Sequence, residues 1–222
     1  MGILFPDTHI SEFQWTNIEI DDLPFYRIEG HSTTQVGDSL YVFGGCRVGG
    51  GYRNQMLEIE LNDYRMSDID DNESYPPNPR AFHRAAAYGT KIIYYGGLNE
   101  SKIYNDYHTF NTTTKKWTHA KCSNAPTPRE HFSFNILNES EHAFLFGGYY
   151  CTPDGEAEYN YNQLFNLNLA CLSWGYLQPT GKLPKGRCMH SAKVINDALW
   201  LFGGKWMVDC STEVFGDLWA IH

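Results

Sequence analysis

A strand-like run that ends in a pair of glycines occurs four times along this 222-residue chain. The four runs are YVFGG, IIYYGG, FLFGG and LWLFGG, and their second glycines are Gly45, Gly97, Gly148 and Gly204. Successive pairs are therefore 52, 51 and 56 residues apart. Self-similarity at such a period is typical of a propeller or a solenoid rather than of a domain with one unrepeated core.

Each copy repeats the same order of residues around its glycine pair. An arginine and a histidine precede every pair, and a second strand-like run such as YNDYHTFN follows it. Trp117 and Trp174 come after this run in the second and third copies, and Tyr64 takes the corresponding place in the first. Apolar runs separated by polar, glycine-rich turns predict four short antiparallel strands in each copy. The arginines and histidines are Arg27 with His31, Arg80 with His83, Arg129 with His131, and Arg187 with His190.

This set of arginine, histidine, Phe-Gly-Gly, Asp-aromatic and tryptophan resembles the kelch repeat, and the resemblance extends from Phe13 to His222. It implies an all-β fold, a kelch-type β-propeller in which each copy forms one four-stranded blade. It also implies a structural role for the repeated residues, because glycines avoid a collision with neighbouring backbone while the other side chains tie the blades together. The residues with this role are Gly44, Gly45, Gly96, Gly97, Gly147, Gly148, Gly203, Gly204, Arg80, His83, Arg129, His131, Arg187, His190, Trp117 and Trp174.

The two ends of the sequence bear on how the blades are completed. The last copy stops at GDLWAIH, which matches the third strand of a blade, while the segment 13–20, FQWTNIEI, has the pattern of a fourth strand. We expect this segment to complete the last blade and to close a ring of four blades. The alternative, a fragment of a larger ring, stays open. In both cases we expect a single domain, 1–222, with blades at about 27–74, 79–122, 128–178, and 186–222 together with 13–20.

Charge and composition argue against several classes of function. The formal net charge is −9 and no run of Lys or Arg is present, which argues against a nucleic-acid partner. No span of about 18 apolar residues suggests a membrane helix, and MGILFPDTH lacks the basic start of a signal peptide. Six scattered cysteines without a CxxC pair are interpreted as reduced thiols. We therefore expect no membrane contact and a cytoplasmic or nuclear location.

Catalytic motifs find little support in the sequence. Kelch rings include copper oxidases and iron-dependent specifier proteins, whose motif spaces Glu, Asp and His four residues apart. Glu213 and Asp217 fit that spacing, but Ile221 holds the third position, and a strand turns the neighbouring His222 to the opposite face. Neither a GxSxG elbow nor a P-loop ending is present. We expect no catalytic residue, metal or cofactor, and a metal-dependent kelch enzyme is the alternative.

The loops that follow the glycine pairs are the predicted binding surface. In a propeller such loops gather around the channel on one face, and here they differ strongly in sequence. Arginine can grip a carboxylate with two hydrogen bonds while Tyr and Trp supply buried area, a combination suited to docking a peptide. The residues predicted to contact a protein or peptide partner are Arg47, Tyr52, Arg53, Tyr149, Tyr150, Lys205 and Trp206.

A narrower resemblance concerns the stretch LPKGRCMHSAKVINDALWLFGG, residues 183–204, and the later GDLW. Both are similar to kelch-domain substrate receptors of cullin-RING ubiquitin ligases, some of which capture protein C-termini. In those receptors two arginines after a glycine pair hold the terminal carboxylate, and Arg47 and Arg53 match that layout, six apart rather than five. The resemblance implies a non-catalytic adaptor with a protein C-terminus and a cullin-RING ligase adaptor as partners. The alternative is that both arginines are solvated loop residues.

Overall fold

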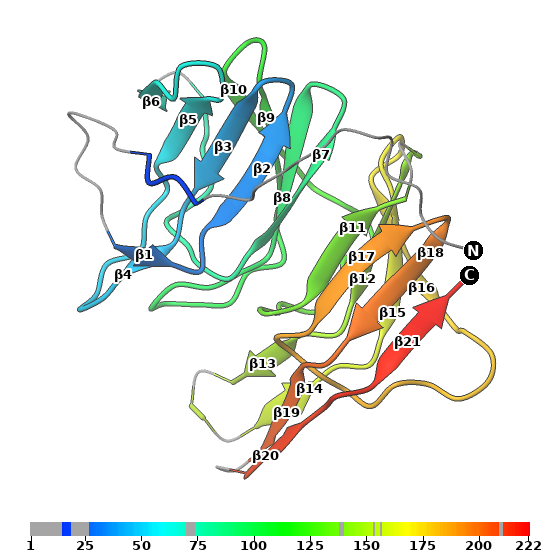
Figure 1. Cartoon of the computed structure of the whole chain (residues 1–222). Coiled ribbons are helices and arrows are strands. Elements are labelled where there is room, and N and C mark those ends of the chain that lie inside the picture. Colours follow the sequence, from blue (N-terminus) through cyan, green and yellow to red (C-terminus); the bar gives the residue numbers. More distant parts are fainter. Residues whose placement is uncertain are drawn as a thin grey trace.

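The computed structural model describes residues 15–18, 27–69, 74–137, 140–152, 154–155, 157–208 and 211–222. Every regular element in these ranges is a β-strand. The strands form four antiparallel sheets that fan around a common space, with two-stranded sheets at one end of the molecule (Figure 1). This is the predicted all-β architecture, a four-bladed propeller of the kelch type.

The blades follow one another in chain order, and in each the strands run outward from the central space. Blade 1 consists of β2 (Ser32–Val36), β3 (Ser39–Phe43), β5 (Met56–Glu60) and β6 (Met66–Ile69). Blade 2 consists of β7 (Arg84–Tyr88), β8 (Lys91–Tyr95), β9 (Tyr107–Asn111) and β10 (Lys116–Ala120). Blade 3 consists of β11 (Ser133–Ile136), β12 (His142–Phe146), β15 (Leu164–Asn168) and β16 (Ser173–Leu177). Blade 4, within the described ranges, consists of β17 (Ser191–Ile195), β18 (Ala198–Phe202) and β21 (Leu218–Ile221).

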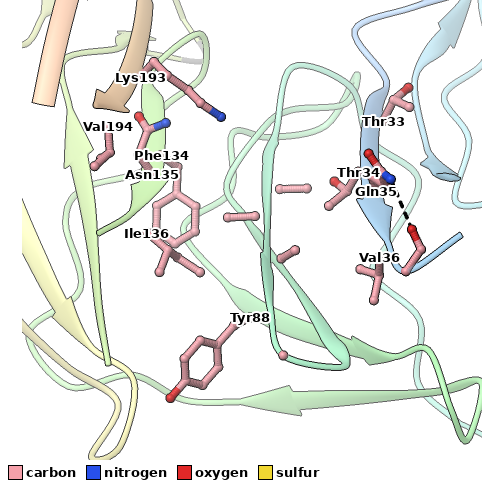
Figure 2. A pocket seen from close by; sticks show the side chains of 15 residues that line it. Thr33, Thr34, Gln35, Val36, Tyr88, Phe134, Asn135, Ile136, Lys193 and Val194 are labelled. Atoms are coloured by element: carbon pink, nitrogen blue, oxygen red, sulfur yellow. Dashed lines mark hydrogen bonds between the residues drawn. The ribbon is translucent and has the colours of Figure 1, made fainter. Parts of the chain in front are cut away.

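The first strand of each blade lines a central cavity of about 980 Å³. β2 lies beside β7, β7 beside β11, and β11 beside β17. Small and polar side chains such as Thr34, Ala86 and Asn135 form much of the wall, together with Tyr88 and Lys193 (Figure 2). The cavity occupies the place of the channel along the axis of a propeller.

Packing between blades follows from the alternation of side chains along the second strand of each blade. Tyr41 and Phe43 of β3 face blade 2 and pack in one cluster with Ile92, Tyr94 and Trp117. Neighbouring residues of the same strand face the other way, so one strand serves two interfaces. The next interfaces repeat this arrangement, with Ile93 and Tyr95 against Leu145 and Trp174, and Phe146 against Leu199 and Leu201.

The glycine pairs lie where blades approach most closely, as predicted. A Cβ atom at Gly97 would lie 2.6 Å from the carbonyl oxygen of Ala81, and one at Gly147 would lie 2.6 Å from that of Arg187. Both glycines also have a positive φ, +86° and +69°. At Gly203 in blade 4 the nearest atom is the Phe215 oxygen at 3.3 Å, because no further blade packs on it in the described part of the chain.

The structure corrects the predicted equivalence of His131 with His83 and His190 by one residue. Phe132, and not His131, occupies the buried position: its ring lies against Gly96 as His83 lies against Gly44 and His190 against Gly147. His131 instead has a positive φ of 53°, like Phe82 and Met189. In the third copy a histidine directly precedes the repeat position, and the sequence comparison therefore assigned that position to His131 instead of Phe132.

The first copy contains two similar shifts. Glu29 pairs with Cys46 as Ala81 pairs with Leu98, so the residue in the arginine position of blade 1 is Ile28 and not Arg27. In the fourth strand Met66 pairs with Ile59 as Trp117 pairs with Phe110, so Met66 takes the tryptophan position. Tyr64 lies in the preceding turn with a φ of 57°.

The expected fourth strand of blade 4, segment 13–20, lies partly outside the described residues. Of this segment the structure describes residues 15–18, which form no strand there, and the Trp15 side chain is fully exposed. Blade 4 also exposes the face that would meet a following blade, with Phe202 at 55% and Leu218 at 62% of their maximal accessible surface. Completion of this blade by segment 13–20 stays a prediction.

Candidate functional site

Hairpins that the sequence did not predict extend from one end of three blades, directly after the glycine pairs. In blade 1, β1 (Ile28–Glu29) pairs with β4 (Cys46–Arg47). In blade 3, β13 (Tyr149–Cys151) pairs with β14 (Glu158–Asn160), and in blade 4, β19 (Lys205–Val208) pairs with β20 (Ser211–Val214). All three lie on the lower left side of the molecule in Figure 1. We call this end the hairpin face.

Beneath the hairpin face, each of blades 2, 3 and 4 contains a fully buried arginine. In blade 2, Arg80 donates hydrogen bonds to the carbonyl oxygens of Asn78 and Gly96 at 3.0 Å and to both carboxylate oxygens of Asp106 at 2.6 and 2.8 Å. Burial raises the pKa of Asp106, but the hydrogen bonds and charges of Arg80 and His108 together outweigh it and hold the pKa well below its usual range. The group therefore ties the glycine turn to the third strand, which is the structural role predicted for these arginines. We call it the arginine clasp.

The clasps of blades 3 and 4 are variants of the same arrangement. Arg187 donates to Gly203 O at 2.9 Å and to the carboxylate of Asp217 at 2.5 and 2.9 Å. Arg129 donates to Gly147 O at 3.0 Å, but its side-chain acceptors are Gln163 Oε1 and Thr127 Oγ1, both at 3.0 Å. Burial lowers the pKa of Arg129 to about 10. An aromatic ring covers each guanidinium at 4.0 to 4.2 Å, namely Tyr104 over Arg80, Tyr161 over Arg129 and Phe215 over Arg187.

Blade 1 lacks the clasp and places its arginine elsewhere. Ile28 stands in the clasp position, and Arg53 stands where the other blades have the covering aromatic ring. The backbone shows this equivalence, since Arg53 N donates to Gly45 O at 2.9 Å as Tyr104 N donates to Gly97 O at 2.7 Å. The Arg53 guanidinium donates to Gln55 Oε1 at 2.6 Å. An arginine therefore lies half-buried at the hairpin face instead of beneath it.

Arg47 and Arg53 line one open pocket of about 380 Å³ together with Tyr52. Arg47 is exposed at the end of β4, and the glycines at positions 49 to 51 form the turn beside it. Burial raises the pKa of the Tyr52 phenol. The structure therefore brings together the three predicted binding residues of blade 1. We call this the two-arginine pocket.

The other predicted binding residues lie on the hairpins of blades 3 and 4. These two hairpins contact each other, and the Asn160 side chain donates to Met207 O and accepts from Met207 N. Tyr149 and Lys205 start β13 and β19 and pair with Glu130 and Cys188. These residues form a second group, which consists of Tyr149, Tyr150, Lys205 and Trp206, and all four are half-buried.

Blade 2 separates these two groups and contributes no hairpin of regular strands within the described residues (Figure 1). Three glutamates that the sequence analysis did not single out surround this part of the face. Glu29, Glu100 and Glu130 each lie close enough to Tyr52 to raise its pKa further. Glu29 and Glu130 directly follow the clasp position in their blades, so the corrected repeat alignment shows them to be equivalent positions. The face therefore combines two arginines with acidic surroundings.

The two acids that fit the spacing of the specifier motif have separate contacts in the structure. Asp217 belongs to the clasp of Arg187, and Glu213 pairs with Lys185 at 3.0 Å, so the two carboxylates serve different partners. Among the described residues, no group of three His, Cys, Asp or Glu side chains could hold a metal ion. Within the same ranges, no helix has the length and apolar character needed to span a membrane.

Known proteins are similar to this chain over most of its length. The chain is 25% identical over 228 residues to tip elongation aberrant protein 1 of Schizosaccharomyces pombe, covering 97% of this chain and 19% of that protein. It is 28% identical over 188 residues to kelch domain-containing protein 3 of Bos taurus, covering 82% and 48%. It is 24% identical over 176 residues to the N-(sulfonatooxy)prop-2-enimidothioate sulfolyase of Thlaspi arvense, covering 78% and 51%. The chain thus spans about half the length of these relatives or less.

A family model covers most of the chain. The model described as "KLHDC2/KLHL20/DRC7 Kelch-repeats domain" matches residues 5–204. Propeller domains of this kind generally serve protein interaction, although one relative is named as an enzyme. Because the matched region covers most of the chain and contains all four glycine pairs, the chain belongs to the KLHDC2/KLHL20/DRC7 family of kelch-repeat domains.

Proposed function

We propose that this kelch propeller is a non-catalytic interaction module that binds the free carboxylate of a protein or peptide in the two-arginine pocket. The observation that supports this most is the position of Arg53. In the other blades this position holds an aromatic ring that covers a buried arginine. In blade 1 the guanidinium itself stands there and shares an open pocket with Arg47. Two guanidinium groups at one pocket offer the paired donors that a carboxylate accepts.

The second group of predicted residues suits the body of the same partner. Tyr150 and Tyr159 lie with ring centroids 6.2 Å apart, and Tyr159 stacks on Tyr161 at the same distance. Such rings supply contact area at low cost in side-chain entropy. The acidic side chains near Tyr52 in the two-arginine pocket, Glu29 and Glu100, favour a partner with basic residues near its carboxylate end.

Two substitutions and a matched control test the proposal. Arg47→Ala and Arg53→Ala each remove one charged donor, for which we expect a loss of at least tenfold in affinity for a peptide with a free C-terminal carboxylate. Arg65→Ala is the control, because Arg65 lies in the turn between β5 and β6 at the opposite end of blade 1 and its side chain forms a surface ion pair with Glu60 (Figure 1). Peptides selected from a C-terminal library are titrated by calorimetry with each variant. Equal affinity for the free and the amidated peptide would rule out carboxylate recognition.

A role as the substrate-recognition unit of a cytoplasmic or nuclear cullin-RING ligase is the finer form of this proposal. It is supported by the sequence resemblance of residues 183–204 and by the family to which the chain belongs. Purification of the chain from cells followed by mass spectrometry tests it, with a cullin adaptor as the expected companion. Metal analysis of the same sample tests the alternative, since stoichiometric iron or copper would favour a kelch enzyme such as the named sulfolyase relative.

A further inference from the structure

Two of the interfaces between blades place a serine of one blade beside a histidine of the next. At the interface of blades 1 and 2, Ser32 Oγ and His83 Nε2 are hydrogen-bonded at 2.8 Å. Ser133 and His190 occupy the same positions at the interface of blades 3 and 4. The histidine rings are seated alike, edge-on to Phe43 at 5.3 Å and to Phe146 at 5.5 Å. The two sites can therefore be compared directly.

The polar atoms of the second site have no partner among the described residues. Ser133 Oγ and both ring nitrogens of His190 have no hydrogen-bond partner among the described residues. Both side chains are buried, since each residue is only 5% exposed. Asn135 donates from Nδ2 to Ala192 O at 3.2 Å, while its Oδ1 is also buried without a partner. Leaving a buried polar group unpaired costs about 1–3 kcal/mol, so several together in one place require an explanation.

A half-buried cation that has no carboxylate partner among the described residues lies beside these atoms. Arg84 is the first residue of β7, and its guanidinium donates to His83 O at 3.3 Å. No carboxylate of the described residues lies within 4.0 Å of it, in contrast to Arg80 and Arg187. Burial lowers the pKa of Arg84. Burial also lowers the pKa of His190, to about 3, and the nearby Arg84 charge contributes to this.

Arg84, Ser133, Asn135 and His190 line a common cavity of about 360 Å³. The cavity adjoins the central one, since Phe134 and Asn135 line both. Neither cavity has an aspartate or glutamate among its lining residues, although the chain has a net charge of −9. The central wall adds a second cation, Lys193, which extends with Asn135 toward this space (Figure 2).

We propose that this cavity binds a carboxylate, which accepts hydrogen bonds from the Arg84 guanidinium, the Ser133 hydroxyl and a ring N–H of His190. A guanidinium can donate two parallel hydrogen bonds to one carboxylate. The negative charge compensates Arg84, and the two oxygens satisfy donors that are otherwise unpaired. With one permanent cation at the cavity and a neutral histidine, a singly charged carboxylate matches the site better than a doubly charged phosphate. The site is separate from the two-arginine pocket and does not rest on it.

The carboxylate can belong to a small acid in the channel or to a peptide that enters it. Both sources present the same group to Arg84, so the probes must separate them. Acetate represents the bare group, and acetamide is its neutral counterpart of the same shape. Two acetylated peptide amides that differ by Glu and Gln at one position represent a side-chain carboxylate, and a free-acid peptide without Glu represents a C-terminus.

The experiment follows the His190 ring signals of the whole chain by NMR during titration with each probe. We expect saturable shifts with acetate and none with acetamide. Arg84→Gln should weaken acetate binding at least tenfold, and Ser133→Ala about threefold, as expected for the loss of a charged and a neutral donor. Ser32→Ala is the matched control at the equivalent interface, and Arg47→Ala is the control for the two-arginine pocket. Neither should change the acetate affinity that the His190 signals report by as much as twofold.

Three results would overturn the proposal. The first is equal shifts with acetate and acetamide, and the second is acetate binding that Arg84→Gln does not change. The third is the absence of any saturable shift, which means that water alone satisfies these atoms. Arg84 forms no ion pair with the described residues, so Arg84→Gln should not unfold the protein. An unchanged or higher melting temperature of this variant confirms that lost binding is not lost structure.

Discussion

Blades 1 and 2 share the same backbone hydrogen bonds around the glycine turn but use arginine in opposite ways. In blade 2, Arg80 is fully buried, paired with Asp106 and covered by Tyr104. In blade 1, Ile28 fills the clasp position and Arg53 moves to the covering position at the hairpin face. The comparison teaches that the place of an arginine in the repeat, and not its residue type, decides whether it lies buried in a clasp or half-buried at the hairpin face.

The largest effect is expected from breaking the clasp of blade 2. Arg80→Met leaves the Asp106 carboxylate, which is 26% exposed, without its cation and removes the bond to Gly96 O. Loss of one partner from a buried pair costs about 3–5 kcal/mol, and we expect about 3 here because Asp106 can reach some water. Denaturant unfolding measures the change. A loss below 1 kcal/mol would show that the clasp does not support the fold.

The next effect concerns the two buried histidines at the blade interfaces. Burial lowers the pKa of both His83 and His190 to about 3. The charges of Arg80 and Arg84 contribute at His83, and those of Arg84 and Arg187 contribute at His190. The unfolded chain takes up these protons near pH 6.5 and the folded chain does not. Stability is therefore complete above pH 6.5 and falls as the pH drops toward 3, by about 2 kcal/mol per histidine at pH 5.

Unfolding of the wild type between pH 7 and pH 5 measures this slope. Replacement of one histidine by glutamine should remove about half of the pH dependence of stability that the two histidines cause. The variant is therefore less stable at pH 7 but less sensitive to acid. An unchanged slope in both His83→Gln and His190→Gln would contradict the neutral, buried state of these rings.

A smaller difference should separate the two serines beside these histidines. Ser32→Ala removes the hydrogen bond to His83 and should cost about 1 kcal/mol. Ser133→Ala removes a hydroxyl that has no partner among the described residues and should change stability by less than about 0.5 kcal/mol. Paired thermal melts under the same buffer measure both. Equal losses would show that the two interfaces are bonded alike.

The repeats made the fold predictable, because four glycine pairs at a regular spacing allow few other architectures. The arginine clasps of Arg80, Arg129 and Arg187 were also identified, since these side chains recur in register. His131 was misassigned because a second candidate, Phe132, fills the same buried position without being a histidine. Ile28 was missed for a similar reason: it occupies the arginine position of blade 1, but the neighbouring Arg27 matched the repeat pattern better.

The residues that line the cavity beside Arg84 could not be predicted from the sequence. Arg84 immediately follows a repeat histidine, and nothing in its own blade shows that it approaches His190 two blades further on. Such a contact depends on the curvature of the sheet array, which no local pattern encodes. The hairpins were missed because their strands have only two to four residues, fewer than an alternating pattern needs to be visible.

The most direct test of the contrast between the two arginines is a pair of measurements on the single variant Arg53→Ala. Its free energy of unfolding should stay within about 0.5 kcal/mol of the wild type, because surface substitutions away from buried networks rarely change more. Its affinity for a peptide with a free carboxylate should fall at least tenfold. A variant that loses several kcal/mol of stability and keeps its affinity would show that Arg53 supports the fold as Arg80 does, and would contradict the account.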